Sequence, residues 1–192
     1  MKTRLFFDTE TNGLPVRQWA PETDLKNWPR LVQLAGAVYE DERLFHEFNF
    51  IIKPEGWIIP DDAAEIHGIT TATALEQGRD LSFVLREFTD YLNLCDEVIC
   101  HNTAFDLKVV AAELIRMNIE NDLMQKPATC TMKAGLIRCN LHNRMGNPKN
   151  PKLVELHKTL FGVGFEDAHN ALTDVRATVK CYFEMRRKEW IK

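Results

Sequence analysis

The sequence contains no apolar stretch long enough to cross a lipid bilayer, which takes about 20 consecutive apolar residues. Near the N-terminus, the apolar run after Arg4 covers only Leu5 to Phe7 before the chain reaches Asp8. That run is too short for the apolar core of a signal peptide. We therefore expect a protein with no secretion signal and no membrane partner.

The sequence also lacks the cysteine patterns that form disulfides or bind zinc. Its 5 cysteines are odd in number, and no two are spaced as a Cys-x-x-Cys pair. This argues against a disulfide framework and against a structural zinc site. The expected protein is reduced and cytoplasmic.

A strong positive charge is missing as well, because the formal net charge is -4. The charge is nevertheless uneven along the chain: between Lys126 and Lys158 the only acid is Glu155, among lysines and arginines. A locally basic segment on an acidic chain can hold a polyanion. A solvated surface without a ligand explains the same charges equally well.

What is present is the pattern of one α/β domain. With 192 residues, 45% of them hydrophobic, the chain can bury one good core, so a single domain over 1–192 is expected. Apolar runs predict strands at 5–7, 31–39, 45–52 and 98–100, with a weaker strand and a helix within 129–139. Helical spacing predicts helices at 62–66, 81–92, 107–115, 153–161 and 172–183. Three strands in a meander followed by βα units predict a mixed five-stranded sheet flanked by helices.

The loop after the first strand is rich in proline and tryptophan. Trp19 and Trp28 have the chemistry to stack on nucleic-acid bases. Tryptophans in long loops more often pin the loop to the core, and we expect that of both.

Acidic residues follow the ends of two expected strands. Asp8 and Glu10 are two residues apart in the first strand, so their side chains project to the same face. Two adjacent carboxylates repel each other unless a cation lies between them, and oxygen ligands of this kind suit Mg²⁺ or Mn²⁺. Asp106 begins the helix after the 98–100 strand, where it would meet them if the two strands are neighbours. Stabilisation of a helix N-terminus is the simpler explanation for Asp106 alone.

His169 and Asp174 lie on either side of the start of the last helix. Residues five apart within one helix would lie well round the axis from each other. We therefore place His169 in the preceding loop and Asp174 in the first turns, so that both reach one site.

Taken together, three segments resemble the motifs of the DEDDh family of 3′–5′ exonucleases, which includes proofreading and RNase T-like enzymes on a ribonuclease H-like fold. The segments are Phe7–Thr11, His101–Asp106 and His169–Asp174, and they occur in the family's order. The stretches 28–35 and 66–70 also resemble the family's second strand and nucleotide-contacting segment. No core position of the family pattern is missing.

The resemblance implies a site for two divalent ions, Mg²⁺ or Mn²⁺. Asp8, Glu10 and Asp174 would hold one ion, and Asp8 and Asp106 the second. Two such ions activate the attacking water and stabilise the leaving oxygen of a phosphodiester. An unperturbed histidine titrates near pH 6.5, which suits His169 to the role of general base.

The family motifs also suggest residues that contact the substrate. The backbone around Thr9 and Thr11 would meet the terminal nucleotide, and Leu14 would wedge against the terminal bases. The remaining candidates, which packing or turn formation explains nearly as well, are His67 and Phe105 against base or sugar, and Asn102 behind the metal ligands.

The expected activity is removal of nucleoside 5′-monophosphates from the 3′ end of single-stranded nucleic acid, in DNA repair or proofreading, with DNA only slightly favoured over RNA. Relatives act as homodimers or as polymerase subunits, and the sequence favours neither. The alternatives are a non-catalytic adaptor that binds nucleic-acid ends and a metal-dependent phosphoesterase of small nucleotides. Only the exonuclease and the adaptor need a basic surface for a chain.

Overall fold

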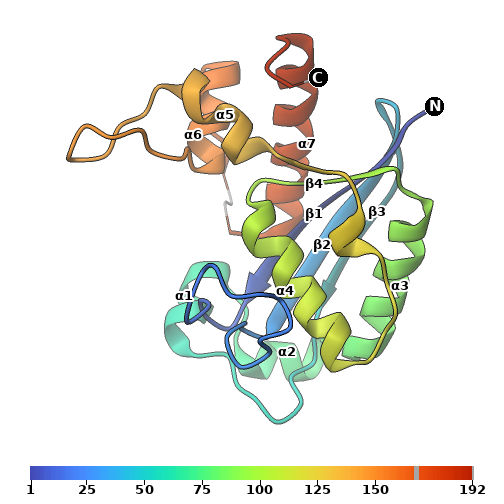
Figure 1. The fold of residues 1–192 in the computed structure, drawn as a ribbon. Coiled ribbons are helices and arrows are strands. Elements are labelled where there is room, and N and C mark those ends of the chain that lie inside the picture. Colours follow the sequence, from blue (N-terminus) through green and yellow to red (C-terminus); the bar gives the residue numbers. More distant parts are fainter. Residues whose placement is uncertain (167–168, 192) are drawn as a thin grey trace.

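The computed structural model describes residues 1–166 and 169–191, and Figure 1 shows their arrangement. Five strands form one sheet in the order β3-β2-β1-β4-β5. The strands are β1 (Thr3–Thr11), β2 (Leu31–Glu40), β3 (Arg43–Ile51), β4 (Glu97–Cys100) and β5 (Ala128–Cys130). β1 pairs antiparallel with β2 and parallel with β4, so the predicted mixed sheet is confirmed.

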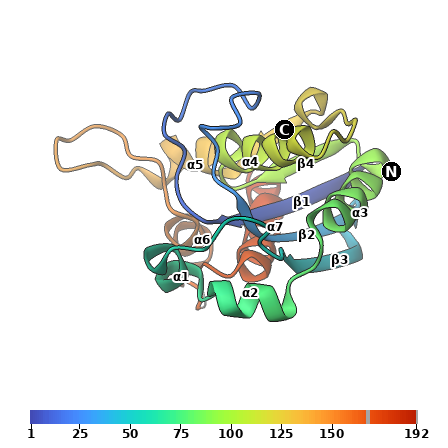
Figure 2. The same cartoon turned by 90° about the horizontal axis from the view of Figure 1, so that it is seen from below.

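Helices cover both faces of this sheet, as Figure 2 shows for α4 and α7. The helices are α1 (Asp61–His67), α2 (Thr71–Gln77), α3 (Leu81–Leu94), α4 (Thr103–Arg116), η1 (Leu123–Gln125), α5 (Thr131–Cys139), α6 (Leu153–Phe161) and α7 (Ala171–Arg187). The predicted weaker strand and helix within 129–139 are both present, as β5 and α5. Asp80 caps α3, because its side chain accepts a hydrogen bond from the Phe83 amide at 3.0 Å.

Alternation along β1 divides the core into two layers. Leu5 and Phe7 are buried in the cluster that contains the apolar faces of α3 and α4. Phe6 points the other way and packs with Val175 and Tyr182 of α7. Because side chains alternate along a strand, the even-numbered residues of β1 face α7 and the odd-numbered ones face α3 and α4. This rule places the functional residues of the same strand.

The long loop between β1 and β2 uses its two tryptophans differently. Trp28 is 3% exposed, and its indole nitrogen donates a 2.9 Å hydrogen bond to the Pro21 carbonyl. Trp19 is 87% exposed. The expectation that both tryptophans pin the loop is therefore confirmed for Trp28 and wrong for Trp19. Ala20, which is buried, takes the inward position beside Trp19.

Within the part of the chain that the structure describes, no helix combines the length and the apolar character that crossing a membrane requires. All five cysteines lie in the described ranges and are free thiols.

Candidate active site

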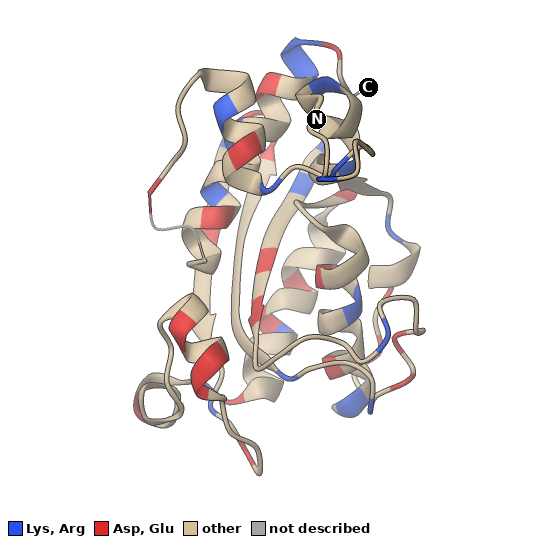
Figure 3. Ribbon diagram, turned by 90° about the vertical axis from the view of Figure 1, so that its left-hand side faces the viewer, with Lys and Arg blue, Asp and Glu red and all other residues tan. Residues whose placement is uncertain are grey.

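The first strand presents Asp8 and Glu10 on the face that α7 covers. Both are even-numbered, like Phe6, whose ring packs 5.2 Å from that of Tyr182 in α7. The two carboxylates therefore point toward the start of α7. Figure 3 shows a group of acidic positions near the middle of the sheet.

The start of α7 brings His169 and Asp174 to the same place. Asn170 caps the helix through its side chain, which accepts from the amides of Leu172 and Thr173. His169 precedes the cap in the left-handed conformation, with φ 72°. Its backbone amide donates to Oδ2 of Asp174 at 3.0 Å. The prediction that His169 lies in the loop and Asp174 in the first turn is confirmed.

Glu10, His169 and Asp174 form a compact group of potential metal ligands. One side-chain donor atom from each lies within 4.8 Å of the others. Glu10 and Asp174 are half-buried, and His169 is exposed. The imidazole thus lies at the solvent edge of the two carboxylates.

Asp106 reaches the site from the opposite layer. It lies in the first turn of α4 and is only 3% exposed. The hydroxyl of Thr9, an odd-numbered residue that faces α4, donates to Oδ1 of Asp106 at 2.8 Å. Thr9 itself is buried, so its hydroxyl positions Asp106 and is turned away from solvent.

Burial raises the pKa of all four acids, and repulsion from neighbouring carboxylates adds to this at Asp8 and Glu10. Burial and the carboxylates of Asp106, Asp174 and Glu10 hold the pKa of Asp8 well above its usual range. Burial, Asp174 and Asp106 raise the pKa of Glu10 to about 8. Burial raises the pKa of Asp106 to about 7 in spite of the hydrogen bonds from Thr9. Burial also raises the pKa of Asp174, although His169 opposes the change. The protein thus assembles four carboxylates that repel one another.

The residues present fit hard divalent cations. Oδ1 of Asp174 is buried and makes no hydrogen bond within the described residues. A buried carboxylate oxygen without a donor is unfavourable unless another positive partner meets it. The acids around Asp8 supply oxygen ligands, which Mg²⁺ and Mn²⁺ prefer.

Beside the acids lies a cavity of about 570 Å³ that contains most of the predicted substrate-binding side chains. Glu10, Thr9, Thr11, Leu14, His67 and Phe105 all line it. Leu14 is 84% exposed, which leaves it available to a ligand. The Thr11 hydroxyl donates to the Gly13 carbonyl at 2.7 Å, so its side chain stabilises the turn.

His67 also has a structural role in the wall of this cavity. It ends α1, and its Nδ1 accepts from the Ile69 amide at 3.1 Å. Burial lowers the pKa of His67, partly offset by the Thr11 carbonyl. Nε2 is buried without a hydrogen-bond partner among the described residues. The contact with the Ile69 amide therefore holds the ring beside the cavity.

Asn102 lies in a second groove, which was not foreseen. Its side chain makes no capping hydrogen bond at the start of α4, while its carbonyl accepts from the amides of Phe105 and Asp106. The groove has a volume of about 520 Å³ and is also lined by Trp19 and Lys133. Trp19 has the chemistry to stack on bases, but from the sequence we expected it to pack on the core; the structure leaves it exposed at the edge of this groove.

The basic segment 126–158 is only partly free to bind a polyanion. Lys126 pairs with Asp122 at 3.3 Å and also donates to the Cys95 carbonyl. Lys149 pairs with Glu155 at 2.7 Å. Lys133 is exposed and forms no ion pair within the described residues. Part of this basic segment is therefore engaged in contacts within the protein.

The sheet order and the acids at the end of its central strand define a ribonuclease H-like exonuclease fold. A family model described as RNase T exonuclease matches residues 5–182. The chain therefore belongs to this exonuclease family, a family of metal-dependent enzymes.

Solved structures of exonuclease I resemble the chain in fold. E. coli exonuclease I in complex with a dT13 oligonucleotide is 20% identical, with a TM-score of 0.77 over 98% of this chain and 42% of that chain. The zinc-bound form of the E. coli exonuclease I–ssDNA complex matches with 20% identity and a TM-score of 0.77 over 98% of this chain and 41% of that one. A product-bound exonuclease I matches with 19% identity and a TM-score of 0.77, covering 99% and 45% of the two chains.

The chain thus spans less than half the length of these exonucleases. No curated protein matches it significantly.

Proposed function

We propose that residues 1–192 form one 3′–5′ exonuclease domain that releases nucleoside 5′-monophosphates from single-stranded nucleic acid. The observation that carries this proposal is the convergence of Glu10, Asp174 and His169, beside the half-buried Asp8 and the buried Asp106. Membership of an exonuclease family supports it. DNA is the proposed substrate, because the similar fold of E. coli exonuclease I is found with single-stranded DNA.

Four acids would hold the metal ions. Asp8, Glu10 and Asp174 would bind one divalent cation, and Asp8 and Asp106 the second, with Mg²⁺ or Mn²⁺ as the ions. When bound, such ions supply positive charge at the scissile phosphate and offset the repulsion among the carboxylates. Without that charge, the acids would repel a phosphodiester.

His169 would accept the proton of the attacking water. Its ring is exposed at the edge of Glu10 and Asp174, and its own amide holds Asp174. The left-handed backbone conformation of His169 allows its ring to lie near the two carboxylates while its amide donates to Asp174. General base catalysis by a positioned histidine contributes about 10²- to 10⁴-fold to a rate.

The cavity next to the acids would receive the terminal nucleotide. The exposed side chain of Leu14 and the ring of Phe105 offer apolar contacts to the base, and His67 forms part of the wall. The hydroxyls of Thr9 and Thr11 have protein partners, so backbone atoms there would meet the nucleotide. Five free thiols suit a cytoplasmic role, and DNA repair or proofreading is the proposed setting.

The test uses 5′-labelled single-stranded DNA and RNA of one sequence, each with Mg²⁺, Mn²⁺ or EDTA. Asp8→Ala and His169→Ala should abolish a metal-dependent ladder that shortens from the 3′ end. Asp61→Asn, which changes an exposed acid of α1, is the matched control and should leave the ladder intact.

Two results would contradict the proposal. Binding of DNA ends without cleavage by the folded, metal-loaded wild type would indicate the adaptor. Cleavage that depends on neither chain length nor salt would indicate a phosphoesterase of small nucleotides.

A further inference from the structure

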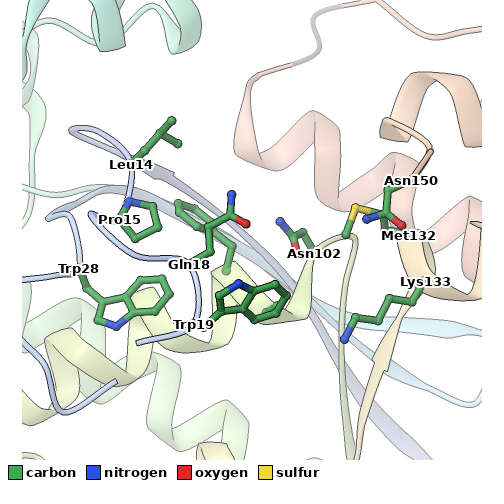
Figure 4. Close-up of a pocket in the computed structure, with 11 residues that line it drawn as sticks. Leu14, Pro15, Gln18, Trp19, Trp28, Asn102, Met132, Lys133 and Asn150 are labelled. Atoms are coloured by element: carbon green, nitrogen blue, oxygen red, sulfur yellow. The ribbon is translucent and has the colours of Figure 1, made fainter. Parts of the chain in front are cut away.

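The side chain of Trp19 is exposed to solvent beside the candidate active site. It is 87% exposed and lines the groove of about 520 Å³ drawn in Figure 4. A tryptophan surrounded by water leaves a large apolar surface unburied, and exposed apolar surface next to a pocket commonly marks a binding site. Other residues that line the groove include Leu14, Trp28, Asn102, Phe105 and Lys133.

The exposure of Trp19 does not come from a loose loop. The adjacent Ala20 is buried, and its carbonyl accepts from Lys108 of α4 at 2.8 Å. On the far side, Arg116 of α4 donates to the carbonyls of Leu25 and Trp28. The loop is thus fastened to α4 while the indole is held away from the core. A backbone held in this way loses little conformational freedom when a ligand stacks on the side chain that it carries.

The groove lies next to the cavity beside the acids. Leu14 and Phe105 line both the groove and the cavity that contains Glu10. A strand whose 3′ end lies at the acids would therefore pass these two side chains before it reaches Trp19. The position suits a nucleotide upstream of the one that is removed.

The chemistry of the groove matches a single strand. Figure 4 shows the side chain of Lys133 extending into the groove from the side of α5, toward Trp19 and Asn102. An aromatic face stacks on any base, and a lysine beside it contacts the phosphate. In a duplex, the base faces are already stacked on each other, so this arrangement favours unpaired nucleotides.

We propose that this groove is a subsite for a nucleotide upstream of the one that is removed, a proposal that rests on the proposed exonuclease function. In it, Trp19 stacks on one base of the single strand, and Lys133 contacts a neighbouring phosphate. The subsite gives the enzyme a preference for chains long enough to reach Trp19.

The experiment pairs Trp19→Ala with oligonucleotides that each lack a base at one position. Binding is measured by fluorescence anisotropy in Mg²⁺ on the His169→Ala background, which prevents cleavage and serves as the wild type for binding. The ratio kcat/KM is measured in Mg²⁺ with His169 intact. Trp19→Ala should weaken binding to an intact strand about tenfold, as loss of one stacked base does. At one upstream position, the abasic strand should bind the wild type about tenfold more weakly, and Trp19→Ala should add nothing further.

Matched variants separate stacking from general damage to the loop. Val16 is in the same loop and is 82% exposed, but it does not line the groove. The Val16→Ala variant should therefore bind the strand like the wild type. Trp19→Phe should keep most of the affinity. Lys133→Gln should weaken binding to every sequence and lower the salt dependence by about one counterion.

The outcomes distinguish this proposal from the exonuclease proposal. The subsite would be overturned if the loss of affinity from Trp19→Ala simply added to the loss from removing a base, at every position of the strand. That result would indicate another occupant of the groove, such as a protein. Coupled binding without cleavage by the wild type would support the subsite and refute the exonuclease. A wild type that neither binds nor cleaves oligonucleotides overturns both.

Discussion

The hydroxyl of Thr9 donates a 2.8 Å hydrogen bond to Oδ1 of Asp106, a residue 97 positions later in the chain. Both side chains are buried. The bond joins the central strand to the first turn of α4, and it holds the one acid of the site that comes from the α4 layer.

Replacing Thr9 by valine tests this contact. Thr9→Val keeps the shape of the side chain but removes the donor, so a buried carboxylate oxygen loses a partner. We expect the free energy of unfolding to fall by about 1–3 kcal/mol, measured by urea denaturation. Exonuclease activity should fall about 10- to 100-fold, because Asp106 is no longer held in place. Thr9→Ser retains the hydroxyl and should stay close to the wild type; equal activity of Thr9→Val would contradict the positioning role.

Variants of His169 and Asp174 should separate the effect on catalysis from the effect on metal binding. His169→Asn should lower kcat by about 10²- to 10⁴-fold, the contribution of a general base. It should keep the rise in melting temperature on adding Mg²⁺, because the carboxylates of Glu10 and Asp174 are intact. Asp174→Asn should lose both activity and most of that rise. If His169→Asn also abolished the metal-dependent rise, the imidazole would be a ligand and not the base.

The acid cluster should make the metal-free protein less stable as the pH rises. The pKa of Glu10 is about 8 in the folded chain, where burial and the nearby acids raise it. An unfolded glutamate titrates near pH 4.3. The folded state therefore holds a proton that the unfolded state has lost, and its stabilising effect disappears as the pH passes through the folded pKa.

This dependence is clearest between about pH 6.5 and 8.5. The pKa values of His67 and His101 are lowered by burial, so both rings stay neutral there in the folded chain and are mostly neutral in the unfolded chain. Thermal melts in EDTA should show Glu10→Gln gaining stability over the wild type across this window. Glu76→Gln, at an exposed position of α2, is the control. A constant difference between Glu10→Gln and the wild type would contradict the prediction, and Mg²⁺ should stabilise the wild type more at the higher pH.

Glu113 is the buried anchor of the segment that leads into β2. It is fully buried in α4, and its Oε1 accepts from Arg30 at 2.8 Å and from the Leu31 amide at 3.0 Å. Arg116 lies 3.2 Å from the same oxygen. Glu113→Ala should lower the free energy of unfolding by about 3 kcal/mol, because it leaves the Arg30 side chain and the Leu31 amide without their acceptor and Arg116 without its counter-charge.

Urea denaturation measures this loss, with Glu76→Ala as the exposed control. Glu113→Gln keeps an oxygen acceptor and should fall between the wild type and Glu113→Ala. A change below about 0.5 kcal/mol in Glu113→Ala, the size typical of surface substitutions, would show that the anchor is dispensable.

Much of the fold could be predicted because its patterns are local. The shared face of Asp8 and Glu10 and the helical spacing over 81–92 depend on residues a few positions apart. The structure confirms the helix as α3, and Phe6 shows the same alternation along β1. The mixed sheet follows from three meander strands and later βα units. The placement of His169 in a loop and Asp174 in the first turn of α7 also follows from their spacing.

The path of the β1–β2 loop could not be predicted. Whether Trp19 or its neighbour Ala20 points inward depends on contacts with Lys108 of α4, which lies far along the chain. A count of charges also did not predict that Lys126 and Lys149 form ion pairs within the protein.

The sequence by itself determined which acids share a face, because side chains alternate along a strand and Asp8 and Glu10 are two residues apart. It also determined the motifs on which the family resemblance depends. The tertiary structure alone decided that Thr9 holds Asp106, that Asp174 keeps a buried oxygen without a hydrogen-bond partner in the described residues, and that Trp19 faces a groove. The physical reason is range: alternation is set by neighbouring residues, whereas these contacts require elements from distant parts of the chain to pack against one sheet.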